Sequence, residues 1–127
     1  MNDIVFPGRP AGVLGQESLP ANYNLVLYKG DYFNTSVIIK DNSGSPINLT
    51  GYTAKCSIKA TPGASTSYDA VCTIDALDGL VDITFPSSVT SGIAAGDYVW
   101  DFQVTNPSNN VRTYLAGDVT VYAEVTV

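Results

Sequence analysis

The sequence contains no histidine among its 127 residues, and this absence removes several classes of chemistry. Histidine is the side chain most often used as a general base and as a metal ligand near neutral pH. A Ser-His-Asp triad, a Cys-His pair and a histidine-bound zinc ion are therefore excluded. The glycines follow neither the GxxxxGK[ST] nor the GxGxxG spacing, so the sequence gives no support to phosphate-loop chemistry.

Charged residues and long apolar runs are also scarce. Only 14% of the residues are charged, and the net charge of -6 would repel a phosphate backbone. No apolar run approaches the 18 or so residues of a membrane span, and the opening MNDIVFPGRPAG lacks the basic and apolar segments of a signal peptide. We therefore expect no nucleic-acid partner, no membrane partner and synthesis in a cytoplasm.

The sequence has two cysteines, Cys56 and Cys72. Each shares the phase of apolar residues two positions away, so both are expected to point inward as small buried side chains. A disulfide between them is one possibility. An intracellular origin and the absence of a CxxC motif favour two reduced thiols instead.

The first 22 residues combine prolines and glycines with no sustained period, which predicts an extended N-terminal arm over residues 1–22. Their apolar residues are more numerous than a solvated tail would carry, so we expect the arm to bind a surface. The arm could dock on its own domain or on a neighbouring subunit, and contact with a neighbour is the prediction. The predicted partner-binding residues are Ile4, Val5, Phe6, Val13 and Leu14.

From residue 23 onward, short β-rich runs alternate with turn clusters, which predicts one all-β domain over residues 23–127. Apolar and polar residues alternate along several runs, as in antiparallel strands with one wet face, so we expect a β-sandwich. A helical turn is expected only within 86–95, with Ser87 or Ser88 as its cap and Gly92 at its end. The predicted strands are 23–28, 32–40, 52–59, 69–74, 80–85, 97–105 and 111–126. The predicted core contains Val37, Ile39, Ile58, Ile83, Tyr98, Trp100 and Phe102.

Two groups of side chains are candidates for a ligand site. The only acidic cluster consists of Asp69, Asp75, Asp78 and Asp82, whose spacing does not match an EF-hand loop. We expect these carboxylates to be solvated in loops. The alternating aromatic side chains within 98–102 are expected to belong to the core and not to a ligand platform. No catalytic residue, cofactor or metal site is predicted, and the protein is not expected to be an enzyme.

Four stretches of the sequence resemble a pattern found in tailed phages. They are LYKGDYF at 27–33, DNSGSP at 41–46, INLTGYTA at 47–54 and GIAAGDYVWD at 92–101. Together they resemble the immunoglobulin-like N-terminal domains of phage baseplate upper proteins and similar small virion proteins. The segment 96–100 also resembles the tyrosine corner of immunoglobulin-like domains. The resemblance implies an antiparallel immunoglobulin-like β-sandwich with the extended arm in front of it.

The function implied by the resemblance is that of a non-catalytic structural virion protein, assembling through its arm and sandwich surfaces. The expected location is the tail, baseplate or fibre-attachment region, with other virion proteins as partners in symmetric multiple copies, after synthesis in the host cytoplasm. A capsid decoration (cement) protein is an alternative. A carbohydrate-binding module is another, and its candidate aromatic residues are Tyr68, Tyr114 and Tyr122.

Overall fold

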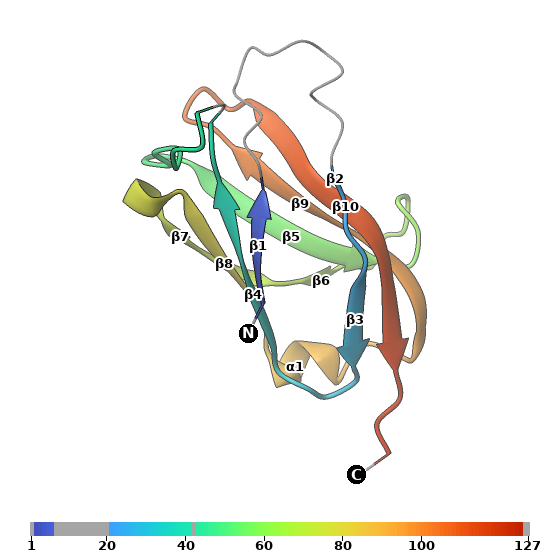
Figure 1. The fold of residues 1–127 in the computed structure, drawn as a ribbon. Helices are drawn as coiled ribbons and strands as arrows, with labels where there is room; N and C mark the ends of the chain where they lie inside the picture. The colour runs from blue at the N-terminus through green and yellow to red at the C-terminus, as the bar shows by residue number, and fades with distance from the viewer. Residues whose placement is uncertain (1, 7–20, 42, 126–127) are drawn as a thin grey trace.

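The computed structural model describes residues 2–6, 21–41 and 43–125, and for residues 2–6 it describes the backbone alone. Two β-sheets face each other (Figure 1). The first sheet is four-stranded in the order β1-β4-β8-β7. Its strands are β1 (Asn2–Phe6), β4 (Phe33–Ile39), β8 (Leu80–Phe85) and β7 (Val71–Asp75).

The second sheet is six-stranded in the order β2-β10-β9-β5-β6, with β3 also paired to β10. Its strands are β2 (Ala21–Asn22), β3 (Leu25–Tyr28), β10 (Val111–Tyr122), β9 (Gly96–Thr105), β5 (Thr53–Lys59) and β6 (Tyr68–Asp69). The predicted all-β class is confirmed, and the strand pairs formed between residues 33 and 122 are antiparallel.

The N-terminal strands depart from the antiparallel pattern. β1 pairs with β4 in parallel, and β2 and β3 both pair with β10 in parallel. These strands reach their partners through non-adjacent parts of the chain, where no tight hairpin imposes an antiparallel direction. The predicted arm, residues 1–22, therefore supplies β1 to one sheet and β2 to the other. The prolines and glycines of residues 7–20 separate these two short strands in the sequence.

One apolar core fills the space between the sheets, and alternate residues of the strands supply it. The predicted core is confirmed for six of its residues, Val37, Ile39, Ile58, Ile83, Trp100 and Phe102. The prediction that Tyr98 is fully buried is wrong, because its ring packs against the core but is only partly buried. Its hydroxyl donates a hydrogen bond to the carbonyl of Ala94 at 2.7 Å, so the polar end of the ring has to remain near the surface.

Short helical turns join some of the strands. α1 (Ser87–Thr90) falls inside the predicted helical segment, but its N-cap is Pro86 and no side chain caps it, which corrects the expectation of a serine cap. Thr90 of α1 donates a hydrogen bond to the carbonyl of Asp31 at 2.8 Å, and Lys29 donates one to the carbonyl of Ser91. The helical turn therefore fixes the loop between β3 and β4. A 3₁₀ turn, η2 (Ala76–Asp78), joins β7 to β8. None of the helices in the described ranges is long and apolar enough to cross a membrane.

Side-chain oxygens organise the turns between β4 and β5. Oδ1 of Asp41 accepts hydrogen bonds from the backbone N–H groups of Ser43 and Ser45 at 2.9 and 3.0 Å. Oδ1 of Asn48 accepts one from the N–H of Thr50 at 3.0 Å in the same way. Such bonds replace the backbone partners that a turn cannot supply. Leu49, between these groups, is buried in the core.

The chain crosses from β2 to β3 at residues 23–24, while β10 continues past both strands. The N–H of Tyr23 donates to the carbonyl of Ala116 at 2.9 Å, and the N–H of Asp118 donates to Oδ1 of Asn24 at 3.0 Å. The carbonyl of Tyr23 accepts a hydrogen bond from Nε1 of Trp100 at 2.7 Å. A Cβ atom added to Gly117 would lie 2.3 Å from that same oxygen, so only glycine fits there. The crossing thus depends on the indole of Trp100 and on the absence of a side chain at Gly117.

Replacing Trp100 should separate its packing from its hydrogen bond. We expect Trp100→Ala to lower the free energy of unfolding by about 3–5 kcal/mol, because it leaves a cavity in the core. Trp100→Phe keeps most of the packing but leaves the carbonyl of Tyr23 without its donor, which should cost about 1–3 kcal/mol. Urea unfolding followed by circular dichroism measures both changes.

The same residue provides a direct check on burial. Trp100 is the only tryptophan, and its side chain is 4% exposed, so native fluorescence should show the blue-shifted emission of a buried indole. Emission typical of an indole in water would contradict the strand phase described here.

Gly117→Ala should destabilise the domain by about 1–3 kcal/mol, because the new methyl group overlaps the carbonyl of Tyr23 and the chain has to shift. Gly63→Ala is the matched control, since a Cβ atom at Gly63 meets nothing within 4 Å. We expect the control to stay within about 0.5 kcal/mol of the parent chain in the same urea titration. Equal stability of the two variants would rule out the tight crossing.

Candidate functional site

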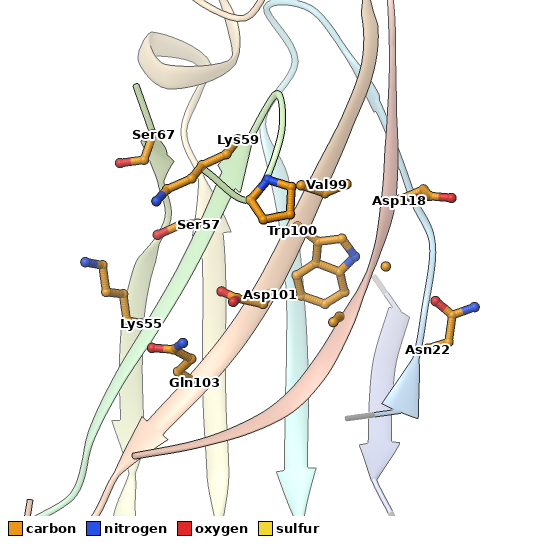
Figure 2. Close-up of a pocket in the computed structure, with 13 residues that line it drawn as sticks. Asn22, Lys55, Ser57, Lys59, Ser67, Val99, Trp100, Asp101, Gln103 and Asp118 are labelled. Carbon is orange, nitrogen blue, oxygen red and sulfur yellow. The ribbon is translucent and has the colours of Figure 1, made fainter. Parts of the chain in front are cut away.

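A groove of about 580 Å³ crosses the outer face of the six-stranded sheet (Figure 2). Residues on β5 and β9 that face away from the core line it. Ser57 lies opposite Asp101, and Lys55 lies opposite Gln103. On the other side of β9, the groove is bounded by Asn22 and Asp118. Side chains alternate between the two faces of a strand. Because every second residue of β5 and β9 is buried in the core, the polar residues between them lie on the outer face.

Asp101 is the electrostatic centre of the groove. Partial burial raises the pKa of its carboxyl group above the usual value, and the positive charges of Lys59 and Lys55 oppose that rise. These two lysines lie on β5, on either side of Ser57. Ser57 donates a hydrogen bond to Asp69 at 2.7 Å, so its hydroxyl is already engaged. The groove therefore presents charges of both signs, an arrangement that suits contact with a polar surface.

The tyrosine surface, defined as Val26, Tyr28 and Tyr122, lies on the same outer face. Leu25 and Leu27 of β3 are buried, so Val26 and Tyr28 point outward, with exposed fractions of 56% and 50%. Tyr28 is the register partner of Tyr122 on β10, and their ring centroids lie 5.5 Å apart. Sequence reasoning missed this surface. The alternation of Leu25 and Leu27 with Val26 and Tyr28 was the signal that could have revealed it.

Of the three tyrosines considered for sugar binding, only Tyr122 is prominently exposed. Tyr68 packs edge-on against Tyr98, with ring centroids 6.3 Å apart. Tyr114 is buried, and the guanidinium group of Arg112 lies 5.2 Å from the centre of its ring. The three side chains therefore do not form a shared platform.

The acidic residues weighed as a metal site are dispersed over several elements. Asp69 accepts the hydrogen bond from Ser57, and Asp82 accepts hydrogen bonds from Asn34 at 3.0 and 3.1 Å. Only Asp75 and Asp78 interact with each other, and the negative charge of Asp78 raises the pKa of Asp75. Within the described ranges, no group of three His, Cys, Asp or Glu residues could hold a metal ion.

Both cysteines are free thiols in the structure. Cys56 is buried in the core, and burial raises the pKa of its thiol well above the usual value. Cys72 is partly buried on β7, and burial raises the pKa of its thiol to about 11. Reactive cysteines have depressed pKa values, so this pair has the character of core residues.

The predicted partner-binding residues of the arm fall into two groups. Ile4, Val5 and Phe6 lie on β1, where they are the register partners of residues 37–39 on β4 of the same chain. Val13 and Leu14 lie outside the described residues. The structure thus gives an acceptor edge for the first group, and contact of the arm with a neighbouring subunit stays a prediction.

Comparison with known proteins gives only solved structures of low sequence identity. No protein-family model matches the chain, and no curated protein matches it either. The N-terminal domain of phage TP901-1 ORF48 is 14% identical with a TM-score of 0.49, over 96% of this chain and 99% of that one. The SrpA adhesin of Streptococcus sanguinis is 14% identical with a TM-score of 0.48, over 79% of this chain and 55% of that one. A Listeria monocytogenes internalin-like protein is 13% identical with a TM-score of 0.41, over 83% of this chain and 28% of that one.

Asp101→Asn should stabilise the protein at neutral pH. The pKa of Asp101 is higher in the folded than in the unfolded chain, so its charged form is disfavoured by folding. The gain in melting temperature should be present at pH 7 and should vanish as the pH falls below about 4, where the carboxyl group is neutral in both states. Asp97→Asn, at the exposed start of the same strand, is the control and should change the melting temperature far less. A gain for Asp101→Asn that persists at pH 3 would contradict the electrostatic cause.

The thiols of the native protein should react slowly with an alkylating agent at pH 8, because burial raises the pKa of both thiols and also covers Cys56. Denaturation without reductant should then give two added labels per chain, counted by mass spectrometry. No label before reduction and two labels after it would reveal a disulfide.

Proposed function

We propose that this chain is a non-catalytic structural protein of a tailed-phage particle, placed in the tail, baseplate or fibre-attachment region. The observation that carries the proposal is the resemblance of four sequence stretches between residues 27 and 101 to such virion domains. In the structure, these stretches hold the α1-bound loop, the Asp41 and Asn48 turns, and the bond from Tyr98 to Ala94. All four stretches form turns or strand ends of the same domain, which supports treating them as one sequence pattern.

The sandwich is, on this proposal, immunoglobulin-like. In immunoglobulin domains, three strands of one sheet follow the order B-E-D, and the facing sheet contains C, F and G. Here the orders β4-β8-β7 and β5-β9-β10 occupy those places. The bond from the hydroxyl of Tyr98 to a carbonyl four residues upstream is the contact of a tyrosine corner.

Assembly would use the outer face of the six-stranded sheet together with the arm. Tyrosine is enriched at the energetic centres of interfaces, and Tyr28 and Tyr122 are both about half exposed. Burying the remaining exposed surface of Val26 beside them would contribute about 1 kcal/mol before ordering costs. The arm residues Ile4, Val5, Phe6, Val13 and Leu14 would add apolar contacts with a neighbour. Repetition in a symmetric assembly strengthens such contacts through avidity.

Purified particles of the encoding phage are expected to contain the chain in several copies, which quantitative mass spectrometry measures. Immunogold labelling at the tail would support the proposal, and labelling over the capsid would favour a decoration protein instead. Specific binding of the isolated protein to a glycan array would favour a carbohydrate-binding module. Particles without the chain would rule out the structural role.

Tyr28→Ser combined with Tyr122→Ser should reduce incorporation into particles at least tenfold, while the isolated protein should still fold, with a modestly lower melting temperature. The two rings are half exposed and contact each other, so their removal costs the free domain some packing but costs an interface more. Leu77→Ser is the matched control, because Leu77 is an exposed apolar residue on η2, away from this face. Normal incorporation of the double variant would exclude the tyrosine surface as an assembly contact.

A further inference from the structure

The edge of β4 accepts the N-terminal strand of the chain. β1 forms a regular parallel pair with it, from Asn2 opposite Thr35 to Phe6 opposite Ile39. The backbone hydrogen bonds of such a pair do not depend on which copy of the chain supplies the strand. The occupant that fits this edge is therefore known from the structure itself: residues 2–6 of this sequence.

The connection behind β1 is longer than its task within one chain requires. β1 runs in the direction of β4, and β2 and β3 run the opposite way, so the end of β1 and the start of β2 face the same end of the sandwich (Figure 1). Packed sheets lie about 10 Å apart, a gap that about four extended residues can cross. Residues 7–20 join the two strands, and fourteen extended residues can reach about 45 Å. The surplus length allows β1 to reach the next molecule.

We propose that copies of this chain exchange their N-terminal strands, so that residues 2–6 of one copy pair in parallel with β4 of a neighbouring copy. Exchange of an identical element forms the contact of the single chain between two chains, so it adds an interface without requiring a new surface. It would also leave no vacant edge on β4, where unpaired backbone groups invite unspecific strand pairing. This inference rests on the proposed function, because it names the partner that the arm contacts when copies assemble.

Two single-cysteine chains test the exchange directly. One carries Asp3→Cys and the other Ser36→Cys, at positions that are register partners, and both carry Cys56→Ala and Cys72→Ala. Neighbouring strands lie about 5 Å apart, within the Cα separation that a disulfide spans. The two chains, one labelled with ¹⁵N, are refolded together, oxidised and analysed by mass spectrometry. We expect a covalent heterodimer as the main oxidised product.

Two control experiments accompany this test. In the first, Ser88→Cys, at an exposed position on α1, replaces Ser36→Cys in a parallel mixture and should yield at least tenfold less heterodimer. A chain carrying both Asp3→Cys and Ser36→Cys reports pairing within one molecule. Closure of that disulfide within monomers, with no heterodimer in the mixture, would overturn the exchange. Failure of both would show that residues 2–6 do not occupy the β4 edge, which also overturns it. The particle measurements remain a separate test, so the exchange can fail while the structural role stands.

Discussion

The carbonyl oxygen of Tyr23 lies between the indole of Trp100 and the backbone of Gly117, and the attachment of the N-terminal segment depends on this contact. Nε1 of Trp100 donates to that oxygen at 2.7 Å, which satisfies a polar group that the core would otherwise leave unpaired. Gly117 leaves the space into which the chain turns, and the side chain of Asn24 supplies the acceptor that β10 loses at the crossing. Because of these three groups, β2 and β3 can follow one another along a single neighbour. β2 thereby pairs with residues 115–116 of β10, β3 pairs with residues 119–122, and Leu25 and Leu27 enter the core.

The two sheets complete their edges in related ways. β10 receives the parallel strands β2 and β3, and β4 receives the parallel strand β1. Parallel addition needs a long connection, which hairpins do not provide, and each of these parallel pairs joins strands that are far apart in the chain. A strand added at an edge satisfies backbone groups whatever molecule it comes from. The same physical feature therefore serves the fold of one chain and offers a route to joining several chains.

The outer face of the six-stranded sheet joins two kinds of surface. The groove around Asp101 carries charges of both signs, whereas the tyrosine surface presents half-exposed rings and Val26. Interfaces between proteins commonly combine aromatic anchors with a polar surrounding. This combination is compatible with assembly. Asp69 and Asp82 accept hydrogen bonds from different partners, and Cys56 is buried in the core.

The sequence by itself determined most strands from β4 to β10, because their alternation of apolar and polar residues and their turn residues act locally. The single strand predicted over 69–74 was wrong: Ala70 separates β6 from β7, and these two strands belong to different sheets. It also determined most of the core: the alternation around Trp100 and Phe102 has only one phase that buries both. The sites were less predictable. Tyr122 and Tyr28 are 94 residues apart in the chain and meet only through the β3–β10 register, and Asp101 and Lys55 meet only across β5 and β9. The parallel pairing of β1, β2 and β3 and the need for glycine at position 117 were likewise decided by the tertiary structure. The physical reason is that pairing between distant strands depends on backbone groups that every residue carries, so the local pattern of side chains does not specify the partner.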